Sequence, residues 1–169
     1  VHRQIDDRTD SVRPGIEVDT RREPVGVVAV ISPWNFPMAT AVWKIAPALA
    51  FGNSVVFKPA NLVPASAWAL TEIISRQSAL PAGTFNLVMG SGSTVGDAII
   101  KSDKIHAVSF TGSLPVGREV AKATAANLVK CQLEMGSKNA LIVAADADLD
   151  VAVNPATGAA YSGTGPERT

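Results

Sequence analysis

Cysteine is almost absent from this chain of 169 residues, which has a single one, Cys131. One thiol cannot form an internal disulfide, and this favours a reducing, cytoplasmic setting. A net charge is absent too, because fifteen Lys and Arg residues balance fifteen Asp and Glu residues. Nucleic acid and anionic membranes attract basic surfaces, so we expect neither as a partner.

Long apolar runs are also missing. The longest apolar-rich stretch, 39–51, contains Lys44 and Pro47 and is too short to cross a bilayer. The polar, charged start of the chain has no apolar stretch of the kind that signal peptides carry. The two histidines, His2 and His106, do not have metal-ligand spacing to each other or to the cysteine, so we predict no metal site.

Apolar residues are plentiful, at 47% of the chain against 18% charged residues. A chain of this length and composition can bury a hydrophobic core. The polar segment 1–23 is predicted to be an extended arm or weak hairpin outside that core. Residues 24–165 are predicted to form the domain itself, and 166–169 an aberrant tail.

From residue 24 onward, short β-branched runs alternate with helical patterns. This alternation predicts an α/β fold, a Rossmann-like mostly parallel sheet with flanking helices. Ligands of such domains bind at the carboxyl ends of the strands. The predicted strands are 25–31, 54–57, 84–88, 107–110, 128–134 and 140–143, and the predicted helices are 38–50, 64–77, 93–101, 115–126 and 147–161, the last interrupted by Pro155 and Gly158.

The segment Ser-Phe-Thr-Gly-Ser at 109–113 joins a predicted strand to a predicted helix, with Gly117 five residues beyond Gly112. Gly112 lets the backbone approach a ligand and adopt φ values that other residues avoid. The N–H groups at the start of the helix favour phosphate, and Ser113 can cap the helix or donate to a phosphate oxygen. The spacing alone favours the simpler alternative of a capped helix after a tight turn.

Lys58 closes the apolar run 55–57 and therefore lies at the predicted ligand edge of the sheet. Its ammonium could reach ribose hydroxyls or a phosphate. Taken alone, the residue is better explained as a solvated lysine at a strand end, since lysine is mostly exposed in proteins.

Pro33 and Pro37 fix the loop that holds Asn35. An amide held rigidly at a strand edge offers N–H donors that can stabilise an oxyanion. The alternative, in which Asn35 satisfies backbone groups of its own loop, explains the residue equally well.

Glu134 ends another apolar strand, where partial desolvation would raise its pKa toward the range of a general base. A salt-bridged glutamate at a strand end is an equal alternative. Cys131 lies within the same strand without a neighbouring histidine, so it is predicted to be a small buried apolar residue and not a nucleophile. Trp43 and Trp68 lie on apolar helical faces and are predicted to be core residues.

These motifs, in this order, resemble the aldehyde dehydrogenase superfamily across essentially the whole of 24–165. The version Glu-Met-Gly-Ser-Lys-Asn is most similar to the α-ketoglutaric semialdehyde (2,5-dioxopentanoate) dehydrogenase branch. The segments that carry the resemblance are Ser-Pro-Trp-Asn-Phe-Pro at 32–37, Phe-Lys-Pro-Ala at 57–60, Phe-Thr-Gly-Ser at 110–113 and Leu-Glu-Met-Gly-Ser-Lys-Asn at 133–139.

The resemblance implies an enzyme that oxidises an aldehyde to a carboxylic acid with NAD or NADP. In the family, a cysteine thiolate attacks the aldehyde, hydride passes to the nicotinamide and water releases the acid. Asn35 would be the amide that stabilises the oxyanion. Glu134 would be the general base that activates the thiol or the hydrolytic water. The parent enzyme would be a homodimer or homotetramer.

The resemblance also assigns cofactor contacts. Lys58 would bind the adenosine ribose, and Trp34 would line the cofactor channel. Gly112, Ser113 and Gly117 would shape the pyrophosphate site. The other residues expected at the cofactor site are Ser32, Pro33, Ala60, Asn61, Gly92, Met135 and Gly136.

Two positions depart from the family pattern. Many NAD-preferring relatives carry Glu at the place of Asn61, and this neutral residue does not repel a 2′-phosphate, which supports NADP use as a hypothesis. Residues 161–165, Tyr-Ser-Gly-Thr-Gly, resemble the run into the family's Gly-Gln-x-Cys motif, but Arg168 stands where the nucleophile belongs. We therefore expect a domain truncated or frame-shifted before the catalytic domain, with little or no dehydrogenase activity of its own. The alternatives are a non-catalytic nucleotide-binding module and a product without function.

Overall fold

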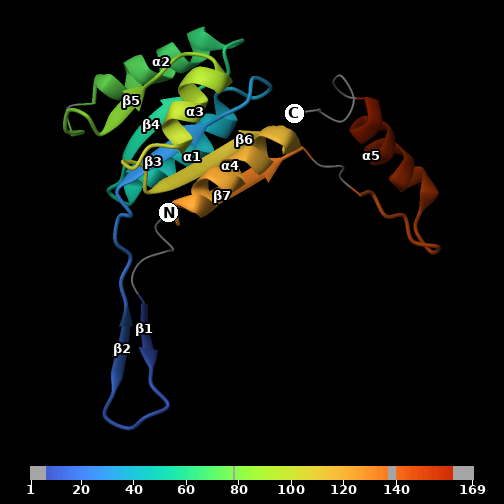
Figure 1. Ribbon diagram of the computed structural model, residues 1–169. Helices are drawn as coiled ribbons and strands as arrows, with labels where there is room; N and C mark the ends of the chain where they lie inside the picture. The colour runs from blue at the N-terminus through green and yellow to red at the C-terminus, as the bar shows by residue number, and fades with distance from the viewer. Residues whose placement is uncertain (1–6, 78, 137–139, 162–169) are drawn as a thin grey trace.

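A five-stranded parallel sheet forms the centre of the computed structural model, which describes residues 7–77, 79–136 and 140–161 (Figure 1). The strands lie in the order β5-β4-β3-β6-β7, and every neighbouring pair is parallel. This sheet confirms the predicted α/β, Rossmann-like fold. The strands are β3 (Val27–Ile31), β4 (Ser54–Lys58), β5 (Phe85–Leu87), β6 (Ala107–Gly112) and β7 (Lys130–Met135).

Helices cover both faces of this sheet, as its largely apolar strands require. On one face, Val30 and Phe57 pack against residues of α1 and α2. On the other face, Phe110 packs against residues of α3 and α4. The helices are α1 (Ala39–Ala50), α2 (Pro64–Ser75), α3 (Asp97–Ile100), preceded by the π-helical turn η1 (Gly92–Gly96), α4 (Leu114–Ala126) and α5 (Leu149–Tyr161).

The first strand of the sheet along the chain, β3, lies in its middle. The chain adds β4 and β5 on one side of β3 and then returns to add β6 and β7 on the other side. The strand order therefore reverses between β3 and β6. In open α/β sheets, ligands bind at such a reversal, in the crevice at the carboxyl ends of the strands.

Two segments extend away from the sheet (Figure 1). The first is an antiparallel hairpin of β1 (Asp7–Asp10) and β2 (Glu17–Thr20), which precedes β3. The second is α5, in which Leu149, Val151 and Val153 are exposed. The helix is continuous through Pro155, so the predicted interruption of this helix is wrong.

The structure corrects three further predictions about single elements. Residues 140–143 do not form the predicted strand, because no strand lies beside them in the described part of the chain to accept their hydrogen bonds. Trp43 and Trp68 are exposed, at 71% and 64%, and not in the core. The helices bury different faces, which carry small residues such as Ala41 in α1 and Ala67 in α2.

Cys131 is exposed and not buried as predicted. It lies on β7, an edge strand of the sheet, which has a neighbour on one side only among the described strands. Within the described residues, no helix is both long enough and apolar enough to span a membrane.

Candidate functional site

Four parallel strands end at one edge of the sheet, where β6 and β7 reach two residues beyond the ends of β3 and β4. Ile31 of β3 pairs with Lys58 of β4 on one side and with Phe110 of β6 on the other. Phe110 in turn pairs with Leu133 of β7. Because the strands are parallel, the segments that follow them begin along one edge, which we call the strand-end rim. The candidate residues that sequence reasoning selected lie on these strands or shortly after them, except Gly92 at the start of η1 and Gly117 within α4.

The loop after β3 begins at this rim with a buried hydroxyl. Ser32 is 4% exposed, and its Oγ has no hydrogen-bond partner among the described residues. Its backbone N–H donates to the Lys58 carbonyl, at 3.3 Å, so the loop remains tied to β4. Asn35 is half-buried and Trp34 is 51% exposed. A buried hydroxyl without a partner is unfavourable, which makes Ser32 a natural contact for a polar ligand group.

Lys58 is buried, at 5% exposure, so the simpler alternative of a solvated lysine is wrong. Its Nζ donates to the Pro59 carbonyl at 2.9 Å. Burial lowers the pKa of the Lys58 amine, because the apolar surroundings disfavour its charged form. The η1 turn packs on its aliphatic chain, since a Cβ at Gly96 would lie 3.8 Å from the Lys58 Cε.

The neighbouring cofactor candidates on this side are more open. Ala60 is half-buried, and Asn61 is exposed in the turn that leads into α2. A Cβ at Gly92 would meet no heavy atom within 4 Å, so the backbone there is open to approach.

Close packing explains the glycines at the end of β6 and in the first turn of α4. Gly112 does not adopt the positive φ that was predicted for it. Instead, a Cβ there would lie 2.6 Å from the ring of Phe110. Gly117 of α4 is buried against β7, since its Cβ would lie 2.3 Å from the Met135 Sδ. Ser113 occupies the N-cap position of α4, but its side chain makes no capping hydrogen bond, so the simple capping role is not realised.

Three side chains in the described part of the chain donate to the Glu134 carboxylate. Lys44 Nζ of α1 and Thr111 Oγ1 of β6 each lie 2.9 Å from Oε2. Gln132 Nε2 lies 3.2 Å from Oε1. The hydrogen bond from Lys44 is the main reason that the pKa of Glu134 is lowered, with a further contribution from Thr111, and together they outweigh partial desolvation. The predicted rise in this pKa is therefore wrong, and the salt-bridged alternative describes the residue.

Sequence reasoning did not select Lys44 for this site. Its side chain is 3% exposed, and its ammonium reaches the half-exposed carboxylate of Glu134. A signal was present, because Lys44 interrupts the longest apolar-rich stretch of the chain. A lysine in such a helix is buried only where an anion or acceptor meets it.

The rim presents different groups on the two faces of the sheet. Side chains alternate along a strand, and Phe57 and Leu133 pack on opposite faces. Lys58 therefore lies on the α3 and α4 face, whereas Glu134 lies on the α1 face with Lys44. Met135 points to the α4 side, and Gly136 follows it as an exposed residue. The arrangement suits an extended ligand that crosses the rim between β3 and β6.

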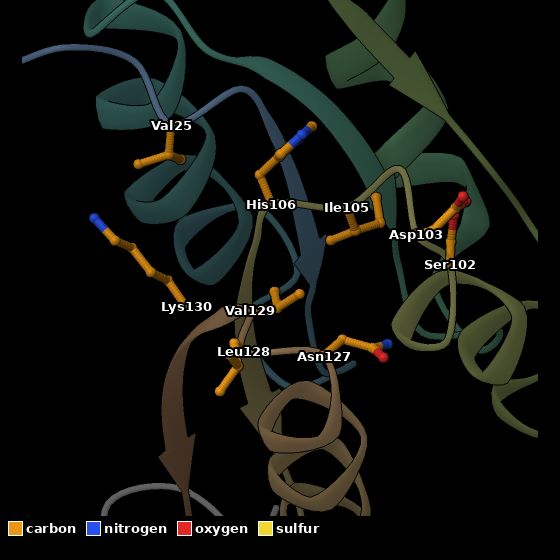
Figure 2. Close-up of a pocket in the computed structure, with 9 residues that line it drawn as sticks. All are labelled: Val25, Ser102, Asp103, Ile105, His106, Asn127, Leu128, Val129 and Lys130. Carbon is orange, nitrogen blue, oxygen red and sulfur yellow. The ribbon is translucent and has the colours of Figure 1, made fainter.

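At the opposite end of the strands, where they begin, lies a pocket of about 580 Å³ that includes none of the predicted site residues. Figure 2 shows that the side chains of His106, Lys130 and Asn127 point in different directions. Within the described segments, no group of three or more His, Cys, Asp or Glu residues could hold a metal ion. The residues that line the pocket are Val25, Ser102, Asp103, Ile105, His106, Asn127, Leu128, Val129 and Lys130.

Known proteins match nearly the whole chain. The model of the aldehyde dehydrogenase family matches residues 1–167. The 2,5-dioxopentanoate dehydrogenase of Saccharolobus solfataricus is 47% identical over 161 residues, which are 94% of this chain and 34% of that protein. The alpha-ketoglutaric semialdehyde dehydrogenase of Bacillus subtilis is 46% identical over 168 residues, which are 96% of this chain and 34% of that protein.

Solved structures agree with these matches. The crystal structure of betaine aldehyde dehydrogenase from Staphylococcus aureus in complex with NAD+ has a TM-score of 0.83 and 41% identity, covering 92% of this chain and 31% of that one. A structure of PnpE in complex with nicotinamide adenine dinucleotide has a TM-score of 0.82 and 38% identity, covering 94% and 32%. The chain thus spans about a third of the length of these proteins.

Proposed function

The chain belongs to the aldehyde dehydrogenase family, and on this basis we propose that residues 24–165 bind the nicotinamide dinucleotide of an enzyme that oxidises an aldehyde to a carboxylic acid. The observation that carries this proposal is the strand-end rim. Four parallel strands end at one edge of the sheet, on the two sides of the reversal between β3 and β6, where the Ser32 hydroxyl is buried and has no partner within the described segments. A dinucleotide that crosses the rim between β3 and β6 would supply that missing partner.

The residues present fit such a cofactor. Lys58 has three N–H donors, of which one donates to the Pro59 carbonyl, and the others can reach ribose hydroxyls. The open backbone at Gly92 and the start of α4 at Ser113 offer further polar contacts. When bound, NAD or NADP supplies the hydride acceptor. The remaining chemistry falls to the protein.

Asn35 and Glu134 are the proposed catalytic residues. The Asn35 amide, held between two prolines, would donate to the oxygen that becomes negatively charged when the aldehyde is attacked. Glu134 is ionised at neutral pH, because its pKa is lowered mainly by the hydrogen bond from Lys44. An ionised carboxylate is the form that can accept a proton from the thiol or from the hydrolytic water.

The proposed substrate is a semialdehyde, such as α-ketoglutaric semialdehyde. The support is the 46–47% identity to two enzymes with names of that kind. Asn61 supports NADP as an alternative to NAD, because its exposed, neutral side chain does not repel a 2′-phosphate. We also propose that the parent enzyme assembles as a homodimer or homotetramer.

A second function is favoured for the 169-residue chain by itself, namely cofactor binding without turnover. Its one cysteine, Cys131, lies on β7 three residues before Glu134. Alternation along the strand directs the Cys131 and Glu134 side chains to opposite faces. The thiol is therefore badly placed to be activated by the proposed base, so we expect binding of NAD or NADP with little or no aldehyde oxidation.

Fluorescence titration and an activity assay on the same chain test both proposals. Replacing Trp43 and Trp68, which are exposed, by phenylalanine leaves Trp34 as the single reporter. NAD+ or NADP+ should quench it saturably, while added aldehyde should produce no NADH or NADPH. Ser32→Ala should weaken binding about threefold. Ser102→Ala, at the opposite end of the strands, should have no effect.

Absence of saturable quenching by either cofactor in a folded chain would contradict cofactor binding. Turnover of aldehyde at rates typical of enzymes would contradict the proposed lack of activity. Near-UV circular dichroism of each variant establishes that the chain is folded, so that loss of binding cannot be confused with loss of structure.

A further inference from the structure

Gln132 connects the Glu134 carboxylate to Ser109. Its Nε2 lies 3.2 Å from Glu134 Oε1, and its Oε1 lies 2.8 Å from Ser109 Oγ. The direction of these hydrogen bonds follows from the chemistry of the groups. An ionised carboxylate only accepts, so the amide must present its NH2 group to Glu134. The amide oxygen then faces Ser109, whose hydroxyl must donate.

The sheet register places these side chains in two adjacent rows. Ser109 of β6 pairs with Gln132 of β7, and Thr111 pairs with Glu134. All four lie on the α1 face. Ser109 is buried, at 8% exposure, whereas Gln132 and Glu134 are exposed. Long exposed side chains lose conformational entropy when they are held still. The buried Ser109 hydroxyl holds the Gln132 amide in place by donating to its oxygen.

The two carboxylate oxygens of Glu134 differ in the number of hydrogen bonds that they accept. Oε2 accepts two hydrogen bonds of 2.9 Å, from Lys44 and Thr111. Among the described contacts, Oε1 accepts one, the longer bond from Gln132. Oε1 therefore has the greater remaining capacity to accept a proton. Gln132 is the side chain that contacts Oε1 in the described part of the chain.

We propose that Gln132 is a positioning residue that holds Oε1 of Glu134, and that Ser109 acts through Gln132 by fixing the orientation of its amide. The functional role of this series of hydrogen bonds, from Ser109 through Gln132 to Glu134, rests on the proposed role of Glu134 as the general base. The hydrogen bonds themselves can be tested in the cofactor-free chain, without that role.

The test is a double-mutant cycle read out at Glu134 itself. The pKa of the Glu134 carboxyl is measured by carbon-13 NMR in the unmodified chain, in Gln132→Met, in Ser109→Ala and in the double variant. Loss of a donor to the charged form should raise the proton affinity of Glu134 about threefold in Gln132→Met. Ser109→Ala should give a smaller rise. In the Gln132→Met background it should give no further change, because Ser109 then has no amide to orient.

Two controls separate positioning from general disturbance. Ser109→Thr keeps the hydroxyl and should restore the pKa of the unmodified chain. Cys131→Ser alters the neighbouring residue of β7 on the other face and should leave that pKa unchanged. Lys44, the charged group that contacts Glu134, is retained in every variant.

An unchanged Glu134 pKa in Gln132→Met would overturn the proposal. Equal effects of Ser109→Ala in both backgrounds would overturn the claim that Ser109 acts through Gln132. Neither result depends on cofactor binding or turnover, so a failure here is distinguishable from a failure of the proposed dehydrogenase function.

Discussion

Lys44 and Glu134 form an ion pair in which only one partner is buried: the side chains are 3% and 49% exposed, and Nζ lies 2.9 Å from Oε2. The pair is therefore unequal. Without Glu134, the ammonium of Lys44 is left in the interior without its counter-charge. Without Lys44, the carboxylate remains in contact with water.

This difference in burial predicts that substitutions of Glu134 and of Lys44 lower the free energy of unfolding by different amounts. Glu134→Gln should lower the free energy of unfolding at pH 7 by roughly 1–2 kcal/mol, because it leaves a buried charge uncompensated. Lys44→Met removes that charge and should cost less. Urea unfolding of both variants measures the difference. A larger loss in Lys44→Met than in Glu134→Gln would contradict the prediction.

The same ion pair predicts an acid dependence of stability. The pKa of Glu134 is lowered in the folded chain, chiefly by the hydrogen bond from Lys44. The ionised form therefore contributes stability above the ordinary glutamate pKa of about 4.3, and this contribution is lost as pH falls through the lowered pKa. Lys44→Met should reduce this acid-dependent loss. Unfolding curves between about pH 7 and pH 3 test the prediction, and parallel pH profiles for the two chains would contradict it.

Lys58→Met should increase the stability of the chain and weaken its binding of the cofactor. Burial lowers the pKa of Lys58, so at neutral pH its charge is held at a cost in the folded chain. Methionine keeps the apolar chain and removes the charge, and it should raise the free energy of unfolding by about 1 kcal/mol. The same change should weaken NAD+ binding about tenfold, because the proposed ribose donor is lost. Lys101→Met, an exposed lysine of a surface ion pair, is the matched control and should change neither quantity.

The contact between Gly117 and Met135 predicts a rescue. In Gly117→Ala the new Cβ would lie 2.3 Å from the Met135 Sδ, so α4 or the methionine must move. We expect a loss of about 1–2 kcal/mol despite the better helix propensity of alanine. Adding Met135→Ala should recover much of the stability that Gly117→Ala loses. Chemical denaturation of the unmodified chain, the two single variants and the double variant measures whether their effects on the free energy of unfolding are additive. Strict additivity would show that the contact is unimportant.

Asn61→Glu should change cofactor preference. A carboxylate placed near the adenosine ribose would repel a 2′-phosphate and could accept from a 2′-hydroxyl. We expect about tenfold weaker binding of NADP+ and equal or tighter binding of NAD+, measured by quenching of Trp34. Asn61→Gln, which keeps a neutral amide, is the control. Equal losses for both cofactors would remove Asn61 from the specificity determinants.

The fold could be predicted from the sequence because its central strands, β3, β4 and β6, are buried on both faces. A run such as 27–31 has no polar alternation, and only a parallel sheet covered by helices accommodates several runs of this kind. Residues 140–143 carry the same kind of signal but have no neighbouring strand within the described segments. Composition gives the tendency to form a strand, whereas pairing depends on what lies beside it.

The candidate site was predictable in position but not in electrostatics. The ends of β3, β4, β6 and β7 follow from strand boundaries, so Lys58 and Glu134 could be placed at one rim. The direction of the Glu134 pKa could not, because it depends on Lys44, 90 residues away along the chain. The exposure of Trp43 likewise depends on which face of α1 meets the sheet, because apolar residues lie on both the buried and the exposed faces of this helix.

The position of β3 in the middle of the sheet affects how the chain folds during synthesis. The β3–β4–β5 half can assemble as soon as those strands emerge, but the other edge of β3 must wait for β6, and Val27 is separated from its contact His106 by 79 residues. At typical translation rates this interval lasts about 4–16 seconds, with a row of unsatisfied backbone groups exposed to other chains. The crevice does not exist until the second half of the sheet docks, so a nucleotide could assist only the last stage of folding.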